Sequence, residues 1–211
     1  MKPSYDMGRV HGANLKILKE IDRICRKYNI KYMLDAGTLI GAVRHNGFIP
    51  WDDDADVAFT RNQYDAFMKV VKRELPEGLE LLEPDSFRGG KGFYDFTARI
   101  IYKKSRCHED SPQMAFYEGK LNHLWVDLFV IDRLPAGRAG AAATKFLHMA
   151  VYGMAMAHRD KLDFGKYSLM NKILVGGLAT VGRIIPMKAI FAMQKALALK
   201  DRNSKGRLRY Y

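Results

Sequence analysis

Four aspartates stand within five consecutive residues, at positions 52, 53, 54 and 56, and the cluster lies between two apolar segments. Carboxylates this close together repel one another unless a cation or solvent compensates them. An acidic surface turn is the usual explanation for clustered aspartates, but such a turn rarely lies between segments that read as core. The flanking residues 48–51 and 57–59 are apolar, which weighs against a solvated turn and favours a functional cluster.

Asp54 and Asp56 belong to a segment that alternates polar and apolar residues, which predicts a strand over 54–59. Side chains two apart on a strand share one face at a spacing of about 6–7 Å, so both carboxylates can reach one or two divalent ions. Asp127 interrupts an apolar strand predicted over 124–131, and a buried carboxylate is costly without a cation. A structural carboxylate satisfied by backbone donors is the alternative for Asp127.

Gly37 and Thr38 follow a short apolar segment, 30–34, and precede a predicted helix over 39–45. A glycine allows the backbone to approach a phosphate closely, and a threonine at a helix start offers its hydroxyl and free amide groups to an anion. An ordinary helix cap uses the same residue types. The pair gains weight from its position, with Thr38 16 residues before Asp54.

Helix and strand signals alternate through the first 135 residues. Apolar residues recur at three and four over 12–28 and again from residue 64 to about 76, which predicts two amphipathic helices, while 79–82 and 93–102 read as further strands. Residues 1–135 therefore predict an α+β catalytic core in which helices flank a mixed sheet. Residues 136–211 carry little strand signal and predict a helical, basic C-terminal part, which Pro186 divides.

The net charge of +12 is concentrated in the last third of the chain. Residues 1–132 hold 20 Lys and Arg against 20 Asp and Glu, whereas residues 133–211 hold 15 against 3. This asymmetry favours contact with phosphate-bearing surfaces, with solvated lysines as the plain alternative. Residues 172–200 mix apolar runs with lysines, which fits either helices that cover the sheet or peripheral contact with a membrane.

The compartment is predicted from features that the sequence lacks. It shows neither a secretory signal nor an apolar run of about 20 residues, and its two cysteines form no closely spaced pair. We therefore expect a cytoplasmic protein, or one held peripherally on the inner face of the membrane.

Two blocks of the sequence resemble the LicD family. AGTLIGAVRHNGFIPWDDDADVAF (36–59) is similar to the family signature, and LWVDLFVIDRLP (124–135) is similar to its second block. The resemblance implies a nucleotidyltransferase-like fold. It also implies transfer of a phospho-alcohol such as phosphocholine from a CDP-linked donor to a sugar hydroxyl of a cell-surface glycan, teichoic acid or lipopolysaccharide.

The resemblance also implies roles for individual residues. The family's metal carboxylates correspond to the three aspartates named above, at positions 54, 56 and 127, so two Mg²⁺ or Mn²⁺ ions are expected there. Gly37 and Thr38 match the phosphate-binding turn, and Arg44 is expected to neutralise the donor phosphates. Arg99 stands where relatives often carry a basic residue.

The C-terminal part departs from the family pattern, because the Tyr-Gly-Asp-Tyr type motif usual there is missing. The chain is therefore expected to be truncated relative to the family or to build its acceptor side differently. Two other functions stay open, namely addition of a nucleotide to a protein, RNA or small molecule, and glycan binding by a relic site without catalysis. The expected partners are the nucleotide-linked donor and a glycan or lipid-linked glycan; nucleic acid is not expected.

Overall fold

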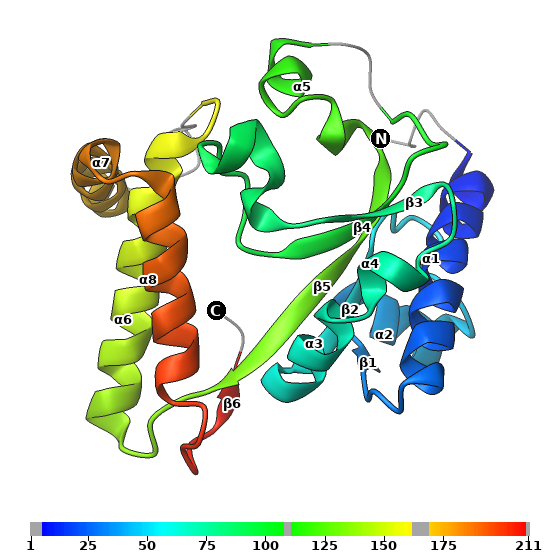
Figure 1. Ribbon diagram of the computed structural model, residues 1–211, viewed down its shortest axis with the longest axis horizontal. Helices are drawn as coiled ribbons and strands as arrows, with labels where there is room; N and C mark the ends of the chain where they lie inside the picture. The colour runs from blue at the N-terminus through cyan, green and yellow to red at the C-terminus, as the bar shows by residue number, and fades with distance from the viewer. Residues whose placement is uncertain (1–5, 108–110, 162–168, 210–211) are drawn as a thin grey trace. The chain divides into compact units, whose positions relative to one another are not determined.

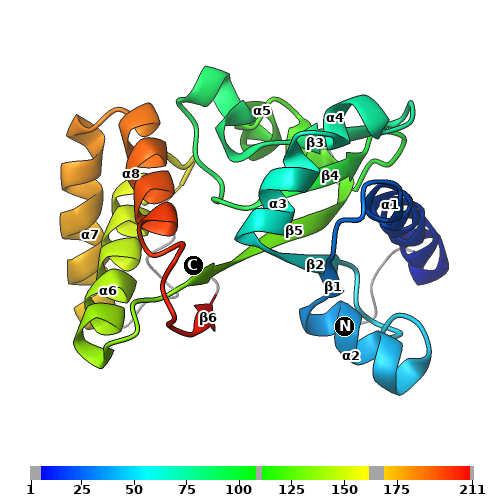
Figure 2. The ribbon, with the colours of Figure 1, turned by 60° about the horizontal axis from the view of Figure 1, so that its bottom comes forward.

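The computed structural model describes residues 6–107, 111–161 and 169–209. Figures 1 and 2 show its helices and strands, which are, in chain order, α1 (Met7–Lys27), β1 (Met33–Leu34), α2 (Ala36–His45), β2 (Ala55–Thr60), α3 (Arg61–Met68), α4 (Val71–Glu74), β3 (Leu79–Leu82), β4 (Ala98–Tyr102), α5 (Pro112–Phe116), β5 (Leu124–Arg133), α6 (Arg138–Ala155), α7 (Leu169–Ile184), α8 (Met187–Lys200) and β6 (Leu208–Arg209). Short 3₁₀ segments occupy Pro84–Gly90, Lys120–Asn122 and Met156–His158.

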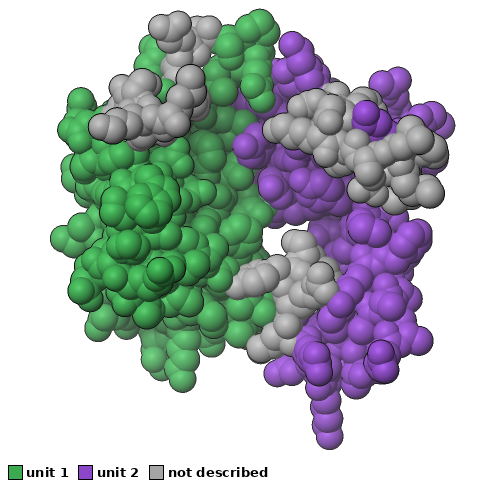
Figure 3. All heavy atoms as spheres, turned by 180° about the vertical axis from the view of Figure 1, so that it is seen from behind, with its two compact units in different colours: residues 1–83, 97–114, 119–131 green, residues 84–96, 115–118, 132–211 purple. Residues whose placement is uncertain are grey.

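The chain divides into two compact units, coloured separately in Figure 3. Unit 1 comprises residues 1–83, 97–114 and 119–131. Unit 2 comprises residues 84–96, 115–118 and 132–211. The two units therefore interleave along the sequence.

The sheet of unit 1 has the strand order β1-β2-β5-β4-β3. β2 and β5 run parallel at its centre, and the other neighbouring pairs run antiparallel. The central pairing joins segments about 70 residues apart in sequence, since the Cα of Asp56 pairs with that of Asp127. Parallel strands need a long crossover connection, and the chain between β2 and β5 supplies it.

One face of this sheet forms the core of unit 1. Val57 and Phe59 of β2 point to the same side as Val126 and Leu128 of β5, and all four are fully buried. They pack with residues of α1, α3 and β4, namely Ile17, Ile21, Ile24, Phe67 and Ile100. Because successive strand residues alternate between faces, the residues between these apolar ones project from the opposite face.

Unit 2 is mainly helical. Figures 1 and 2 both show α6 with α7 and α8 alongside it, and its core gathers Phe93, Val151, Met187 and Ile190. β6 pairs antiparallel with the last two residues of β5. No single helix among the described residues has the length and apolar character to cross a bilayer; Val175–Ile184 and Met187–Lys200, which meet at 116°, satisfy that test only as a pair.

The predicted fold class is confirmed: a mixed sheet flanked by helices, followed by a helical C-terminal part. Pro186 separates α7 from α8 as predicted. The strand predicted over 93–102 is wrong in its first half, since only Ala98–Tyr102 is strand. Phe93 is buried in the aromatic and aliphatic core of unit 2 instead, which an apolar pattern alone could not distinguish from a strand.

Candidate active site

A polar row crosses the three central strands on the face opposite the core of unit 1. The Cα of Asp56 on β2 pairs with that of Asp127 on β5, and the Cα of Asp127 pairs with that of Arg99 on β4. Residues in register on neighbouring strands lie about 5 Å apart and share a face. The predicted carboxylates Asp56 and Asp127 therefore lie side by side, with a buried arginine next to them.

Asp127 is held by two side-chain donors. The Nε–H of Arg99 donates to its Oδ1 at 2.6 Å, and the Nε1–H of Trp125 donates to its Oδ2 at 3.0 Å. The Arg99 guanidinium also lies 4.7 Å from the centre of the Trp125 ring. Arg99 and Asp127 expose only 7% and 13% of their side chains, so this ion pair is shielded from solvent. Side-chain donors, not backbone donors, thus satisfy this strand carboxylate.

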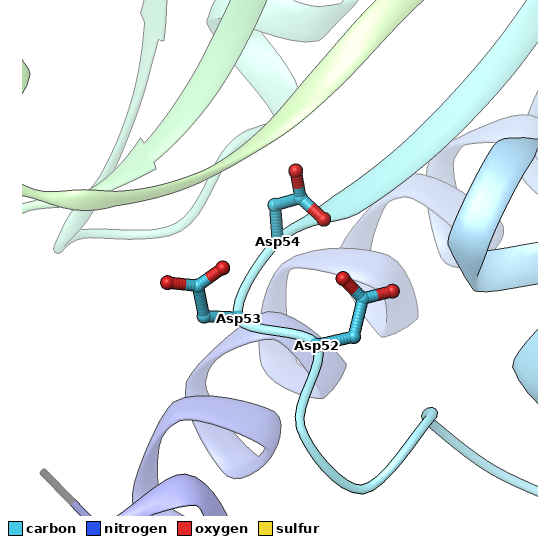
Figure 4. A group of neighbouring side chains, drawn as sticks. All are labelled: Asp52, Asp53 and Asp54. Atoms are coloured by element: carbon cyan, nitrogen blue, oxygen red, sulfur yellow. The ribbon is translucent and has the colours of Figure 1, made fainter. Parts of the chain in front are cut away.

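The segment before β2 carries three more carboxylates, drawn in Figure 4. Asp52, Asp53 and Asp54 each offer an oxygen within 4.8 Å of the others, which is close enough for one cation to bridge them. Among the described residues, these three aspartates form the group of acidic, histidine or cysteine side chains that meets this spacing. The predicted trio of Asp54, Asp56 and Asp127 does not meet it. The oxygens of Asp127 face Arg99 and Trp125 instead.

Helix α1 fixes this acidic segment through its backbone. The Nε2–H of His11 donates to the carbonyl oxygen of Asp52 at 2.8 Å, and the Nδ2–H of Asn14 donates to that of Asp53 at 3.2 Å. His11 is also stacked on Phe48 with ring centres 4.8 Å apart. Because the carbonyls are bound from α1, the carboxylates are left to face one another.

The predicted phosphate-binding turn braces the acidic residues from the other side. A Cβ on Gly37 would collide with Oδ2 of Asp52, so a larger residue there would force that carboxylate to turn from its present position. Thr38 is buried, and its Oγ1 accepts a hydrogen bond from the backbone N–H of Asp56 at 2.8 Å. The backbone N–H of Asp35 donates to the carbonyl of Asp56 at 3.1 Å. The start of α2 and the start of β2 are therefore locked together.

Arg44 lies apart from these groups. It is exposed in the last turn of α2, seven residues beyond Gly37, which corresponds to a rise of about 10 Å along the helix. Among the described residues, no hydrogen bond or ion pair joins Arg44 to the aspartates. Its predicted role toward the donor phosphates stays a prediction.

The crowded carboxylates hold protons more tightly than usual. Burial, followed by repulsion from Asp54 and Asp127, raises the pKa of Asp56 to about 7. Loss of hydration, followed by the neighbouring Asp52, raises the pKa of Asp54 to about 6. A divalent cation would reverse both shifts, and carboxylate oxygens are the ligands that Mg²⁺ and Mn²⁺ prefer. The donor set therefore fits such an ion.

A cleft of about 710 Å³ adjoins the acidic segment within unit 1. Asp53 and Asp54 form part of its wall, and Arg9 and Lys16 of α1 line the same space. The sequence predictions missed this surface. The available signal was the i, i+3, i+7 spacing of Arg9, Gly12 and Lys16, which lies on one face of a helix.

Comparison with known proteins gives a family for the part of the chain that carries this site. Residues 29–133 match a family model described as LicD/FKTN/FKRP, nucleotidyltransferase domain. A segment of 121 residues is 33% identical to the lipopolysaccharide cholinephosphotransferase LicD of Haemophilus influenzae and covers 57% of this chain and 42% of that protein.

Shorter matches involve two uncharacterized rickettsial proteins. A Rickettsia typhi protein is 39% identical over 56 residues, 26% of this chain and 18% of its own length. A Rickettsia prowazekii protein is 50% identical over 42 residues, 20% of this chain and 16% of its own length. The matched segments thus span less than half of each of these relatives.

Proposed function

Because residues 29–133 are a LicD-family nucleotidyltransferase domain, we propose that the chain transfers a phospho-alcohol such as phosphocholine from a CDP-linked donor to a sugar hydroxyl. The acceptor is a cell-surface glycan, with lipopolysaccharide as the first choice because the Haemophilus relative is named for it. The reaction depends on a divalent cation held by the aspartates at the start of β2.

The observation that carries this proposal is the pairing of β2 with β5. It sets Asp56 beside Asp127 on the face of the sheet opposite the core, directly after the three carboxylates at 52–54. An acidic turn without function would not require a second carboxylate, 71 residues later in the sequence, on the neighbouring strand. Two separate elements that converge on one acidic site support metal-assisted phosphoryl-type transfer.

The residues that would hold Mg²⁺ or Mn²⁺ are Asp54 and Asp56, as the family resemblance implies, with Asp52 and Asp53 close enough to Asp54 to share the ion. When bound, such an ion neutralises charge on the phosphate oxygens. Asp127 lies in register with Asp56, but its oxygens are bound by Arg99 and Trp125, so it contributes to the site through its position and its charge. A second ion would need Asp127 to turn from Arg99.

The reaction itself makes one bond and breaks one bond. The acceptor hydroxyl oxygen attacks the phosphorus that carries the alcohol, the bond from this phosphorus to the bridging oxygen breaks, and CMP leaves with that oxygen. Both oxygens of Asp127 already accept hydrogen bonds, which leaves Asp52 the better placed carboxylate to take the hydroxyl proton. Alignment and charge, not a covalent intermediate, supply the rate.

Product analysis tests the proposal. The purified protein is incubated with Mg²⁺ or Mn²⁺, a lipopolysaccharide acceptor and, in turn, CDP-choline, CDP-ethanolamine, CDP-ribitol and CDP-glycerol. We expect metal-dependent release of CMP from one of these donors and none after chelation. Release of pyrophosphate from CTP would point to nucleotide transfer instead, and no turnover with any donor, under conditions where nucleotide binds, would support a non-catalytic role.

The acceptor side is proposed to lie at a membrane surface. Residues 133–211 hold 15 Lys and Arg against 3 Asp and Glu, and α7 and α8 combine this charge with apolar residues. Such helices can lie on anionic lipid while the sugar is presented to the site. The protein should sediment with anionic vesicles at low salt. Sedimentation of an equal fraction of the protein with vesicles of neutral lipid would contradict this.

A further inference from the structure

The cleft beside the acidic segment has the chemistry of an anion site. Its volume of about 710 Å³ falls in the range of small-ligand pockets. Four cations line it, Arg9 and Lys16 from α1 and Lys104 and Arg106 from the segment after β4. These elements are distant in sequence, so the fold brings their charges together.

Three carboxylates line the cleft. Asp6 is the N-cap of α1, and its Oδ1 accepts a hydrogen bond from the backbone N–H of Gly8, whereas the other two lie at the proposed metal position. Asp53 and Asp54 face the cavity, and a divalent cation there would cancel their charge. The remaining lining then holds four cations against the one carboxylate of Asp6.

Tyr102 and Trp125 add aromatic rings to the same cavity. Lys16 lies over one face of the Tyr102 ring at 5.4 Å and Arg99 over one face of the Trp125 ring at 4.7 Å, so a base would stack on the opposite face of either ring. A ligand with a diphosphate next to a planar ring matches both features.

The third observation is the open space around Gly12. Gly12 lies inside the 21-residue helix α1, where a glycine destabilises the helix relative to alanine. A Cβ built on Gly12 meets no atom within 4 Å, so no neighbour in the protein needs its smallness. Gly12 lines the cleft, and the space that its absent side chain leaves belongs to the cavity.

We propose that this cleft is the binding site for the nucleoside diphosphate part of the donor, and that Gly12 keeps the cleft open for it. This rests on the proposed function, which supplies the donor and the cation at Asp54. The phosphates lie between that cation and the basic residues of α1 and the 104–106 segment. A larger residue at position 12 would fill the cavity without disturbing the fold.

Calorimetric titration with CDP at saturating Mg²⁺ tests this, with wild type and the variants Gly12→Leu and Gly12→Ala. Leucine should weaken CDP binding by about tenfold or more, whereas alanine should change it by less than about threefold. The melting temperature of Gly12→Leu should not fall, because leucine is the better helix former. Gly177→Leu is the matched control, since Gly177 is an exposed glycine in α7 whose Cβ also meets nothing within 4 Å.

Two further probes keep the outcomes distinct. Lys104→Glu should also weaken CDP binding, and this exposed position provides a test if Gly12→Leu fails to fold. Glucose 6-phosphate represents a phosphorylated acceptor, and a Gly12→Leu protein that loses this ligand but keeps CDP would overturn the assignment. Equal CDP affinity in wild type and Gly12→Leu would also overturn it and leave the proposed function standing. Failure of wild type to bind CDP with Mg²⁺ would overturn both.

Discussion

Single side chains at this site are arranged for ligand binding at the expense of stability. Asp56 is only 8% exposed, and the charges that raise its pKa are those of other carboxylates. Its pKa is about 7 in the folded chain against 3.8 without the fold. The folded protein therefore binds the proton more tightly, and the stability that this supplies below pH 4 is lost as pH rises through 7.

Asp56→Asn should remove this penalty. Without metal at pH 8, we expect the variant to be more stable than wild type by on the order of 2–4 kcal/mol, and nearly equal to it at pH 4. Urea unfolding in EDTA at both pH values measures the difference. Mg²⁺ should stabilise wild type but not the variant. A variant that is less stable than wild type at pH 8 would contradict the repulsion assigned to Asp56.

Arg99 has the opposite role, because it stabilises Asp127. Arg99→Met would leave a buried carboxylate without its cation, which costs about 3–5 kcal/mol. Adding Asp127→Asn to this variant should restore part of the loss, since the uncompensated charge is then gone. A thermodynamic cycle over the two single variants and the double variant checks this. Additive effects would mean that the two residues do not interact.

The ends of helices and strands position the acidic segment. The glycines of the two helices beside it, α1 and α2, differ in their surroundings. Gly41 of α2 is a close-contact position, since a Cβ there would lie 2.6 Å from the carbonyl oxygen of Gly47 and 2.8 Å from the nitrogen of Ile49. Gly12 of α1 faces open space. The same residue type is thus required sterically in one helix and by the cleft in the other.

Alanine at these two positions should therefore change stability in opposite directions. Gly41→Ala should lower the free energy of unfolding by about 2–3 kcal/mol, because backbone atoms must move. Gly12→Ala should raise it by about 0.5–1 kcal/mol through helix propensity. Denaturant titrations of both variants provide the comparison. A destabilised Gly12→Ala protein would show that the space around Gly12 is not open.

Helices and strands could be predicted from the sequence where the apolar pattern and the flanking residues indicated the same element. β3 and the bulk of β2 and β5 follow from alternating or continuous apolar residues, and Pro186 marks the break between α7 and α8. The sequence did not predict that α1 holds the acidic segment, because His11 and Asn14 bind carbonyls 41 and 39 residues away. The pairing of Arg99 with Asp127 likewise depends on strand register, which no local pattern encodes.

For the chain as a whole, the sequence predicted the acidic residues of the candidate site but not the lysines and arginines that line the cleft. The aspartates at 52–56 and Asp127 are unusual for their apolar surroundings, so a single sequence identifies them. Lysines and arginines are common on surfaces, and only the fold shows which of them line the cleft. Arg44, expected from the family resemblance, lies in the last turn of α2, away from the end of the helix that contacts the carboxylates.

Binding of Mn²⁺, followed by electron paramagnetic resonance, tests most directly whether the aspartates hold a divalent cation. Wild type should bind Mn²⁺ and reduce the free-ion signal, and Asp54→Asn and Asp56→Asn should each weaken this binding by about tenfold or more. Asp85→Asn, which removes an exposed carboxylate from unit 2, should bind as wild type does. Equal Mn²⁺ affinity in wild type and Asp56→Asn would contradict the metal site.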